Sequence, residues 1–383
     1  MARSWTGLYP EVCSWQNLLL AYRRCRRRKR YAPDAAEFDY DWESRLLQLQ
    51  SDLASESWFP GPYRHFHISD PKPRMISAAS FSDRVVHHAV VNVLEPIFEP
   101  RFVFDSYACR RGKGTHRAID RAQYYLRRHS WTLKTDIVKF FPNVDHELLM
   151  LRLQRRLRDV PLLTLLQRIV DSGAGVFADQ RLYQPFPGDD LFSSLRPVGL
   201  PIGNLTSQFL ANVCLDPLDH FVKEVLRVPG YVRYCDDLVL FGDSRTQMWE
   251  YRDAISQHLA GLRLRLHPRK THVAPQGRGV NFLGLRIRVA EKRVLSSTLR
   301  RFSRRMARLQ WLLGEGLVTF PEIARSIRAW TAHCKHANSR GVVLDLLRRL
   351  RFGRSGSRSP AAARPEPDIF SARLQETGVA DPE

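Results

Sequence analysis

The stretch that most constrains the fold is Tyr231-Val-Arg-Tyr-Cys-Asp-Asp-Leu-Val-Leu-Phe241. Apolar, β-branched and aromatic residues form its two arms, and Asp236 and Asp237 lie side by side between them. This pattern predicts two strands joined by a tight turn, with two acidic side chains at the tip. An exposed hairpin would not need the apolar run from Leu238 to Phe241, so we expect the hairpin to belong to a buried sheet.

The adjacent carboxylates have two interpretations. Aspartate is common in turns, so Asp236 and Asp237 can be an ordinary solvated pair. On rigid and buried backbone, however, two neighbouring negative charges repel each other unless a divalent cation neutralises them. Because carboxylate oxygens are ligands that Mg²⁺ prefers, the second interpretation makes the hairpin tip a candidate metal site.

The charge of the chain indicates its partner. Its 383 residues include 60 Lys and Arg against 39 Asp and Glu, which gives a formal net charge of +21 at pH 7. Such an excess is most simply matched by a polyanion, and nucleic acid is the first candidate. An acidic membrane surface is the second, but no apolar run approaches the ~20 residues that span a bilayer.

Localisation is predicted from the N-terminus and the cysteines. The apolar residues 18–22 precede a basic block, which is the wrong order for a signal peptide. The 6 cysteines form no Cys-x-x-Cys pair, which argues against a zinc ribbon and a disulfide framework. We therefore expect a cytoplasmic protein without membrane contact.

A third acid follows an alternating segment. Trp131, Leu133 and Thr135 alternate with other residues up to Asp136, which predicts a strand that ends at this acid. We expect the extended run to continue through Phe140-Phe141 and to stop at Pro142. If this strand neighbours the hairpin, three carboxylates can hold two divalent ions ~4 Å apart, the clamp used for in-line displacement at phosphorus.

Cations gather at two turns and on one helix. One pair flanks a proline-rich turn near residue 72, and another lies in a glycine-spaced loop that opens a helix near Thr115. Free amides at a helix start favour phosphate, although the loop spacing is not that of a P-loop. A later amphipathic helix over 296–313 carries arginines opposite its apolar stripe, for solubility alone or for phosphate binding. These residues are Lys72, Arg74, Arg111, Lys113, Arg300, Arg301, Arg304, Arg305 and Arg308.

Taken in chain order, these motifs resemble the palm of a reverse transcriptase. They are Asp136-x-x-x-x-Phe141 after a strand, a Gly-x-x-x-Ser loop at 203–207 before a helix, and Tyr-Cys-Asp-Asp at 234–237. The resemblance runs from about Tyr63 to Leu285. It implies an α+β fold of the right-hand polymerase type, with fingers, a palm with an antiparallel sheet, and a helical thumb.

The resemblance also implies domain boundaries. We expect a basic, helical N-terminal extension over 1–62, fingers over 63–130, and a palm over 131–285 with a fingers insertion near 150–200. A helical thumb over 286–352 and a disordered tail over 353–383 complete the predicted layout.

The central loop indicates the kind of reverse transcriptase. Group II intron enzymes usually carry Gln-Gly-x-x-x-Ser-Pro there, whereas this chain reads Ile202-Gly-Asn-Leu-Thr-Ser-Gln208. This form is similar to the reverse transcriptases of diversity-generating retroelements. Such enzymes copy a template-repeat RNA into cDNA with errors at adenines, and the cDNA diversifies a target gene. No Cys/His endonuclease module is present in the sequence, so intron homing is not expected.

The resemblance assigns roles to individual residues. Phe141 corresponds to the aromatic residue that excludes a 2′-hydroxyl, and Lys270 to a cation of the later palm. Catalysis and binding of two Mg²⁺ ions fall to Asp136, Asp236 and Asp237. The residues implied to contact the deoxynucleotide are Phe141, Lys72, Arg74, Arg111, Lys113, Ile202 and Gly203. The implied primer grip consists of Phe282, Leu283 and Gly284. The arginines of 300–308 are implied to bind nucleic acid.

The implied partners are template RNA, a primer, deoxynucleoside triphosphates and a small basic accessory protein. Ile202 replaces a glutamine of related enzymes, and we hypothesise that losing this polar contact weakens discrimination against mispairs. Two alternatives stay open: a defence-type or retron-like bacterial reverse transcriptase, and a catalytically inactive nucleic-acid-binding protein with the same palm.

Overall fold

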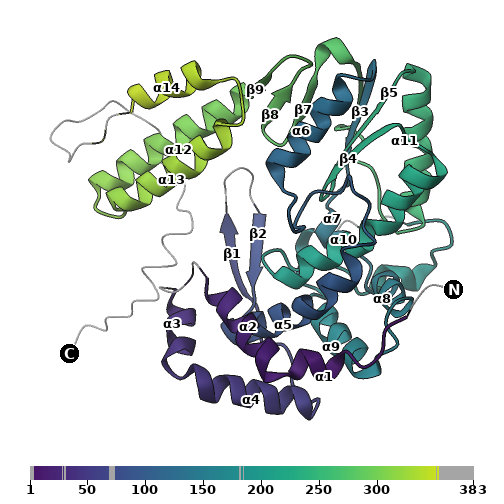
Figure 1. Ribbon diagram of the computed structural model, residues 1–383, viewed down its shortest axis with the longest axis vertical. Coiled ribbons are helices and arrows are strands. Elements are labelled where there is room, and N and C mark those ends of the chain that lie inside the picture. The colour runs from purple at the N-terminus through teal and green to yellow at the C-terminus, as the bar shows by residue number, and fades with distance from the viewer. Residues whose placement is uncertain are drawn as a thin grey trace.

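The computed structural model describes residues 4–27, 29, 32–68, 74–180, 183, 185–350 and 352. Lys72 and the predicted disordered tail over 353–383 lie outside this range. Helices and antiparallel sheets are both extensive, so the predicted α+β class is confirmed (Figure 1). No helix in the described ranges is both long enough and apolar enough to cross a bilayer.

Five helices form a layer at one end of the molecule. Phe38 and Leu46 are buried in it, and the tyrosine ring of Tyr22 stacks on Trp42 with ring centroids 5.5 Å apart. Helix α5 is the long apolar helix at its centre, and buried valines at three- and four-residue spacings form its packed face. The helices are α1 (Tyr9–Cys13), α2 (Trp15–Arg26), α3 (Pro33–Tyr40), α4 (Trp42–Ala54) and α5 (Phe81–Phe98).

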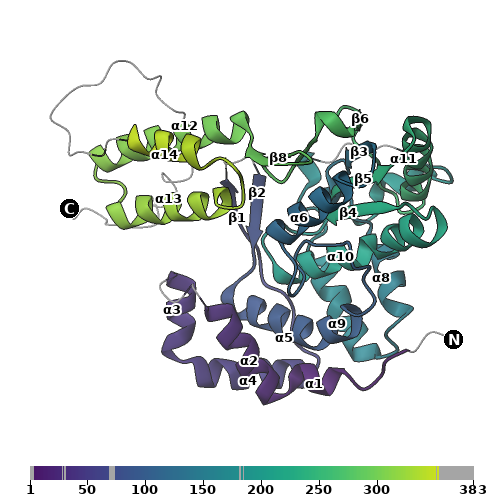
Figure 2. The same ribbon diagram turned by 45° about the horizontal axis from the view of Figure 1, so that its top comes forward.

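A two-stranded hairpin connects α4 to α5. Strands β1 (Arg64–Ile68) and β2 (Arg74–Ala78) pair antiparallel, with Phe66 opposite Ile76. The hairpin rises from the α1–α5 layer toward the C-terminal helices (Figure 2).

The central element is a four-stranded antiparallel sheet with the order β4-β5-β3-β6. Two later segments flank β3, so residues more than a hundred positions apart become neighbours. The strands are β3 (Trp131–Asp136), β4 (Gly230–Tyr234), β5 (Asp237–Gly242) and β6 (His272–Pro275).

The two faces of this sheet are covered differently. Leu133, Leu238 and Leu240 join the core that includes α10 and α11, whereas Val239 and Phe241 join a second core with α6. Side chains alternate between faces along a strand, so successive residues of β5 separate into these two cores. The helices are α6 (Thr115–Leu126), α10 (Leu205–His220) and α11 (Arg245–Ala260).

Shorter helices fill the segment between β3 and α10. Asp145 caps α8, since its carboxylate accepts a hydrogen bond from the Leu148 amide at 3.0 Å. Helices α8 and α9 contribute to the same core as the sheet. The elements are α7 (Phe140–Asn143), α8 (His146–Gln154), α9 (Val160–Asp171), and the 3₁₀ segments η1 (Ala178–Gln180) and η2 (Leu191–Leu195).

The C-terminal part combines a small sheet and three helices. The sheet packs against α6 through Phe282, Leu285 and Ile287. Phe302 of α12 stacks on Trp330 of α13, with centroids 3.7 Å apart. The elements are β7 (Val280–Phe282), β8 (Leu285–Ile287), β9 (Lys292–Val294), α12 (Ser296–Gly314), α13 (Phe320–Cys334) and α14 (Arg340–Arg348). A π-helical turn η3 (Phe221–Val225) and a 3₁₀ turn η4 (Gln276–Arg278) complete the chain.

Candidate active site

Three aspartates meet at one end of the two inner strands of the central sheet. The register of β3 and β5 places Asp136 directly opposite Asp237, and Asp236 precedes Asp237 in the hairpin turn. The amide of Ile137 donates a hydrogen bond of 3.1 Å to the Asp236 carbonyl, which joins the turn to the end of β3. The two elements are thus neighbours in one sheet, which is the condition that the two-metal interpretation required.

The hairpin turn has two residues, Cys235 and Asp236, because Tyr234 pairs with Asp237. Cys235 adopts a φ of 57°, in the left-handed region that two-residue hairpin turns require at their first position. A residue other than glycine in this conformation costs free energy and persists only where its surroundings fix it. The residues around the turn must therefore hold Cys235 in this conformation.

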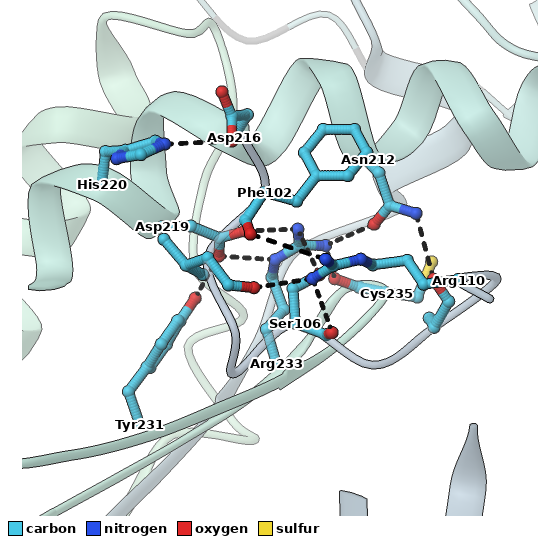
Figure 3. Close-up of polar contacts among 12 residues, drawn as sticks. Phe102, Ser106, Arg110, Asn212, Asp216, Asp219, His220, Tyr231, Arg233 and Cys235 are labelled. Atoms are coloured by element: carbon cyan, nitrogen blue, oxygen red, sulfur yellow. Dashed lines mark hydrogen bonds and ion pairs between the residues drawn. The ribbon is translucent and has the colours of Figure 1, made fainter. Parts of the chain in front are cut away.

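A buried ion pair behind the hairpin provides this support (Figure 3). Arg233 and Asp219 are both fully buried, and Arg233 Nε donates to Asp219 Oδ1 at 2.7 Å. Arg233 Nη1 donates to the Cys235 carbonyl at 3.2 Å, and Nη2 donates to the Ser106 hydroxyl at 3.0 Å. Tyr231 adds a hydroxyl donor to Asp219 at 2.7 Å. The guanidinium thus ties the strained turn to α10 and to the segment before α6.

Neither Arg233 nor Asp219 has a role predicted from the sequence. The available signal was an arginine in the middle of an apolar strand, since such a residue needs an acid partner if it is buried. The partner itself, 14 residues earlier, has no signature of its own.

Charges at the carboxylates are partly balanced by lysines. Lys270 Nζ lies 2.9 Å from Asp136 Oδ1, and Lys134 Nζ lies 3.6 Å from Asp237 Oδ1. Burial, and then the charge of Asp136, raise the pKa of Asp236. Burial also raises the pKa of Asp237, while Lys134 acts in the opposite direction. The site therefore concentrates negative charge that its own lysines neutralise only in part.

The metal-binding capacity of the site depends on these same oxygens. Among the described residues, no three acidic, histidine or cysteine side chains are already gathered around one point as metal ligands. The donor chemistry nevertheless fits Mg²⁺, because three carboxylates supply hard oxygen ligands, and the charge of Asp136, after burial, contributes to the raised pKa of Asp236. An ion here would take over the charge balance that Lys134 and Lys270 provide.

The central loop predicted to contact the nucleotide lies against β2. Ser77 donates its amide to the Ile202 carbonyl at 2.8 Å, and Asn204 Nδ2 donates to the Ser77 carbonyl at 2.9 Å. Gly203 has a φ of 122°, and an added Cβ would lie 2.9 Å from Ile76 Cγ2. Glycine is thus required both by backbone conformation and by space.

Phe141 lies in α7 and not at the end of an extended run. The expected extension to Pro142 is wrong, because β3 ends at Asp136 and Phe140–Asn143 forms a helical turn after Lys139, whose φ is 41°. Phe141 is half-buried, and its carbonyl accepts a hydrogen bond from the Leu200 amide at 2.9 Å. The aromatic residue is thereby joined to the central loop.

The predicted nucleotide-binding cations differ in their surroundings. Arg74 is exposed on β2. Burial raises the pKa of Asp236, and the charge of Arg74 acts in the opposite direction, so Arg74 lies within electrostatic range of that carboxylate. Arg111 is exposed. Lys113 instead donates to the Phe104 carbonyl at 2.7 Å and lies 3.3 Å from the centre of the Phe104 ring. Its ammonium is therefore engaged by its own loop.

The predicted primer-grip residues form the β7–β8 turn. Phe282 is fully buried, and the turn residues Leu283 and Gly284 have φ values of 48° and 83°. An added Cβ on Gly284 would lie 3.2 Å from His333 Nε2 of α13. The turn packs with the core on the Val239 and Phe241 face, the face to which Asp237 belongs by alternation.

Helix α12 carries the predicted nucleic-acid-binding arginines. Arg300, Arg304 and Arg305 are exposed, while Arg301 and Arg308 are half-buried. Arg301 donates to the Thr298 hydroxyl at 3.2 Å. The opposite side of the helix buries Phe302 and Met306, so the predicted amphipathic character is confirmed.

Comparisons with known proteins agree with this arrangement. The family model described as reverse transcriptase (RNA-dependent DNA polymerase) matches residues 69–287, more than half of the chain. Protein YkfC of Escherichia coli is 27% identical over 315 residues, covering 70% of this chain and 79% of that protein.

Intron-encoded proteins are also similar. The group II intron-encoded protein LtrA of Lactococcus lactis is 25% identical over 186 residues, covering 48% of this chain and 29% of LtrA. The mitochondrial nuclear intron maturase 1 of Arabidopsis thaliana is 31% identical over 203 residues, covering 43% of this chain and 28% of that protein. The chain thus spans less than a third of these two relatives.

Proposed function

The chain belongs to the reverse transcriptase family of RNA-directed DNA polymerases, and we propose that it extends a primer on an RNA template with Asp136, Asp236 and Asp237 as its catalytic carboxylates. The observation that carries the proposal is the register of β3 and β5, which sets Asp136 opposite Asp237 at the tip of a buried sheet. In this proposal β3–β6 belong to the palm, β1–β2 to the fingers, and α12–α14 to the thumb.

Each residue near the carboxylates has a task in this reaction. Two bound Mg²⁺ ions would activate the primer 3′-hydroxyl and stabilise the leaving pyrophosphate. Arg74 acts electrostatically on Asp236, and in this proposal it neutralises triphosphate charge. Lys270 and Lys134 hold Asp136 and Asp237 in position before nucleotide and metal arrive.

Preference for a deoxynucleotide would follow from shape. Phe141 is half-buried, and the central loop attached to it reaches β2 through Ile202 and Asn204. An aromatic ring under the sugar leaves no room for a 2′-hydroxyl, so a ribonucleotide is excluded sterically.

Primer extension tests the catalytic proposal. We expect purified protein with Mg²⁺ and deoxynucleoside triphosphates to extend a DNA primer on RNA, and Asp236→Ala to lower the rate by more than about 10³-fold. Asp253→Ala removes an exposed carboxylate of α11 and serves as the matched control. Equal rates for wild type and Asp236→Ala would refute the proposal and would favour a nucleic-acid-binding protein without catalysis.

We further propose the error-prone activity of a diversity-generating retroelement, with a template-repeat RNA and a small basic accessory protein as partners. The support is Ile202, which places an aliphatic side chain beside Gly203 in the central loop. An apolar residue cannot reject a mispair by leaving a hydrogen-bonding group unpaired, so discrimination falls.

Sequencing of the cDNA tests this finer assignment. Wild type should misincorporate opposite template adenines more often than opposite the other bases, and Ile202→Gln should lower that excess. Ile202→Leu keeps the apolar character and is the control. An adenine error rate that stays the same in Ile202→Gln would contradict the proposed role of Ile202.

A further inference from the structure

A second concave site lies at the far end of α10 from the central loop. Helix α10 begins at Leu205, and Asp216 follows 11 residues later, about 17 Å along the axis at 1.5 Å per residue. The pocket there has a volume of about 200 Å³. It is lined by Phe98, Arg101, Arg152, Arg155, Arg156, Val213, Asp216 and Pro217.

Four guanidinium groups converge on this pocket without protein partners. Within the described part of the chain, none of the four arginine side chains donates a hydrogen bond or forms an ion pair. Arg156 Nη1 is buried and lacks any hydrogen-bond acceptor. Leaving a buried charged donor unsatisfied is costly, so the arrangement calls for an acceptor from outside the chain.

The electrostatics of the pocket agree with this conclusion. Burial, and then the charge of Arg155, lower the pKa of Arg152; burial and the charge of Arg101 lower that of Arg156. Like charges therefore press on each other inside the pocket. An anion that bound between them would relieve this repulsion.

Asp216 neutralises the cluster only in part, since its charge acts on Arg152 and Arg156 against burial and the neighbouring arginines. Its Oδ1 has no hydrogen-bond partner and faces His220 Nε2 at 3.4 Å, as Figure 3 shows. Burial raises the pKa of Asp216 to about 6, so the protein environment disfavours even this one negative charge. One carboxylate directed toward a histidine leaves a net positive pocket.

We propose that this pocket binds a phosphodiester group of an RNA strand, at a place separate from the three catalytic aspartates. Arginine presents its donors as a planar fork that matches two phosphate oxygens, and several forks around one pocket can satisfy one phosphate fully. The apolar wall of Phe98, Val213 and Pro217 excludes water on one side, which strengthens each charge-assisted hydrogen bond.

RNA is favoured over an acidic peptide by the rest of the molecule. The chain carries a net charge of +21, and an RNA template longer than the catalytic site must lie along other parts of its surface. The pocket would hold such a strand at the C-terminal end of α10, and thereby anchor the template while its copied end moves.

Binding of the full chain to RNA tests the proposal. The affinity for a fluorescein-labelled single-stranded RNA of about 40 nucleotides is measured by anisotropy at several salt concentrations. Arg152→Gln/Arg155→Gln removes two forks, and Arg158→Gln, with Arg158 exposed outside the pocket, is the control. We expect the double variant to bind on the order of 10-fold more weakly and its salt slope to fall by about 0.7 per lost phosphate contact.

Further measurements distinguish RNA phosphate from free phosphate as the ligand, and failure of this proposal from failure of the catalytic proposal. Extension of a short primer–template that ends within the catalytic site should be unchanged in the double variant, which shows that the fold and the catalytic proposal stand. An RNA affinity and salt slope equal to those of Arg158→Gln would overturn the proposal. Thermal stabilisation by inorganic phosphate that disappears in the double variant, with RNA affinity unchanged, would also overturn it, in favour of a free-phosphate site.

Discussion

Two tight turns on this molecule share a left-handed first residue and differ in what holds them. The β4–β5 turn has Cys235 at a φ of 57°, and the β7–β8 turn has Leu283 at 48°. The first is held from behind by the buried guanidinium of Arg233. The second contacts the C-terminal helices, because the Gly284 carbonyl accepts from the Leu295 amide at 3.2 Å.

The two turns therefore depend on different parts of the molecule. A turn that carries carboxylates must keep them in a fixed geometry, and a fully paired ion network inside the core provides this rigidity. The β7–β8 turn lies beside His333 of α13, so the C-terminal helices help to position it. We therefore expect the β4–β5 turn to lose its conformation only when the protein unfolds. The β7–β8 turn should change position when residues of the C-terminal helices are substituted.

Removing the anchor of the first turn should have the largest effect. Arg233→Met leaves the Asp219 carboxylate buried without its cation, which costs about 3–5 kcal/mol of unfolding free energy. Denaturant unfolding measures this loss. Arg45→Met breaks an exposed ion pair with Glu37 and should change stability by less than about 1 kcal/mol. Similar losses in both variants would show that the network does not hold the turn.

A change in the second turn should cost less. Gly284→Ala forces alanine to a φ of 83° and brings its Cβ to 3.2 Å from His333 Nε2, for a combined cost of about 1–3 kcal/mol. A double-mutant cycle with His333→Ala separates the two contributions. The contact part should vanish in the double variant while the conformational part stays. A purely additive cycle would mean that the turn does not depend on α13.

The smallest expected effect has the opposite sign. The folded-state pKa of Asp236 is raised, so its ionised form is disfavoured by folding, and the carboxylate destabilises the protein above that pKa. Asp236→Asn should therefore raise the unfolding free energy at pH 7 by on the order of 1 kcal/mol when divalent ions are chelated. The gain should shrink as the pH falls and Asp236 takes up a proton.

Asp243 provides a contrast for that measurement. The Ser130 amide donates to its carboxylate and lowers its pKa, so Asp243→Asn should lower stability at pH 7. If both variants shifted stability in the same direction, the charge environment of Asp236 would not explain its effect.

Much of this architecture was accessible from the sequence. The strand ending at Asp136, the hairpin at Asp236 and the amphipathic helix over 296–313 have strong periodic patterns, and all three are confirmed. Local patterns carry this information because side-chain period separates strands from helices.

What escaped prediction was set by packing or by very short segments. Helix α7 spans only four residues after the left-handed Lys139, so no periodicity could reveal it. Strands β7–β9 have three residues each, which is also too short for a periodic pattern to reveal them. The arginine pocket combines α8, α10 and the end of α5, and no local signal brings those segments together.

The strand order of the central sheet has a consequence for synthesis of the chain. Strand β3 has both of its partners, β5 and β6, later in the sequence. At about 5–20 residues per second, the ribosome needs roughly 5–20 s after β3 to deliver β5. During that interval β3 stays with both edges unpaired, which is a hazard for aggregation. The three carboxylates therefore come together late, and a nascent chain that stops before residue 237 cannot assemble them.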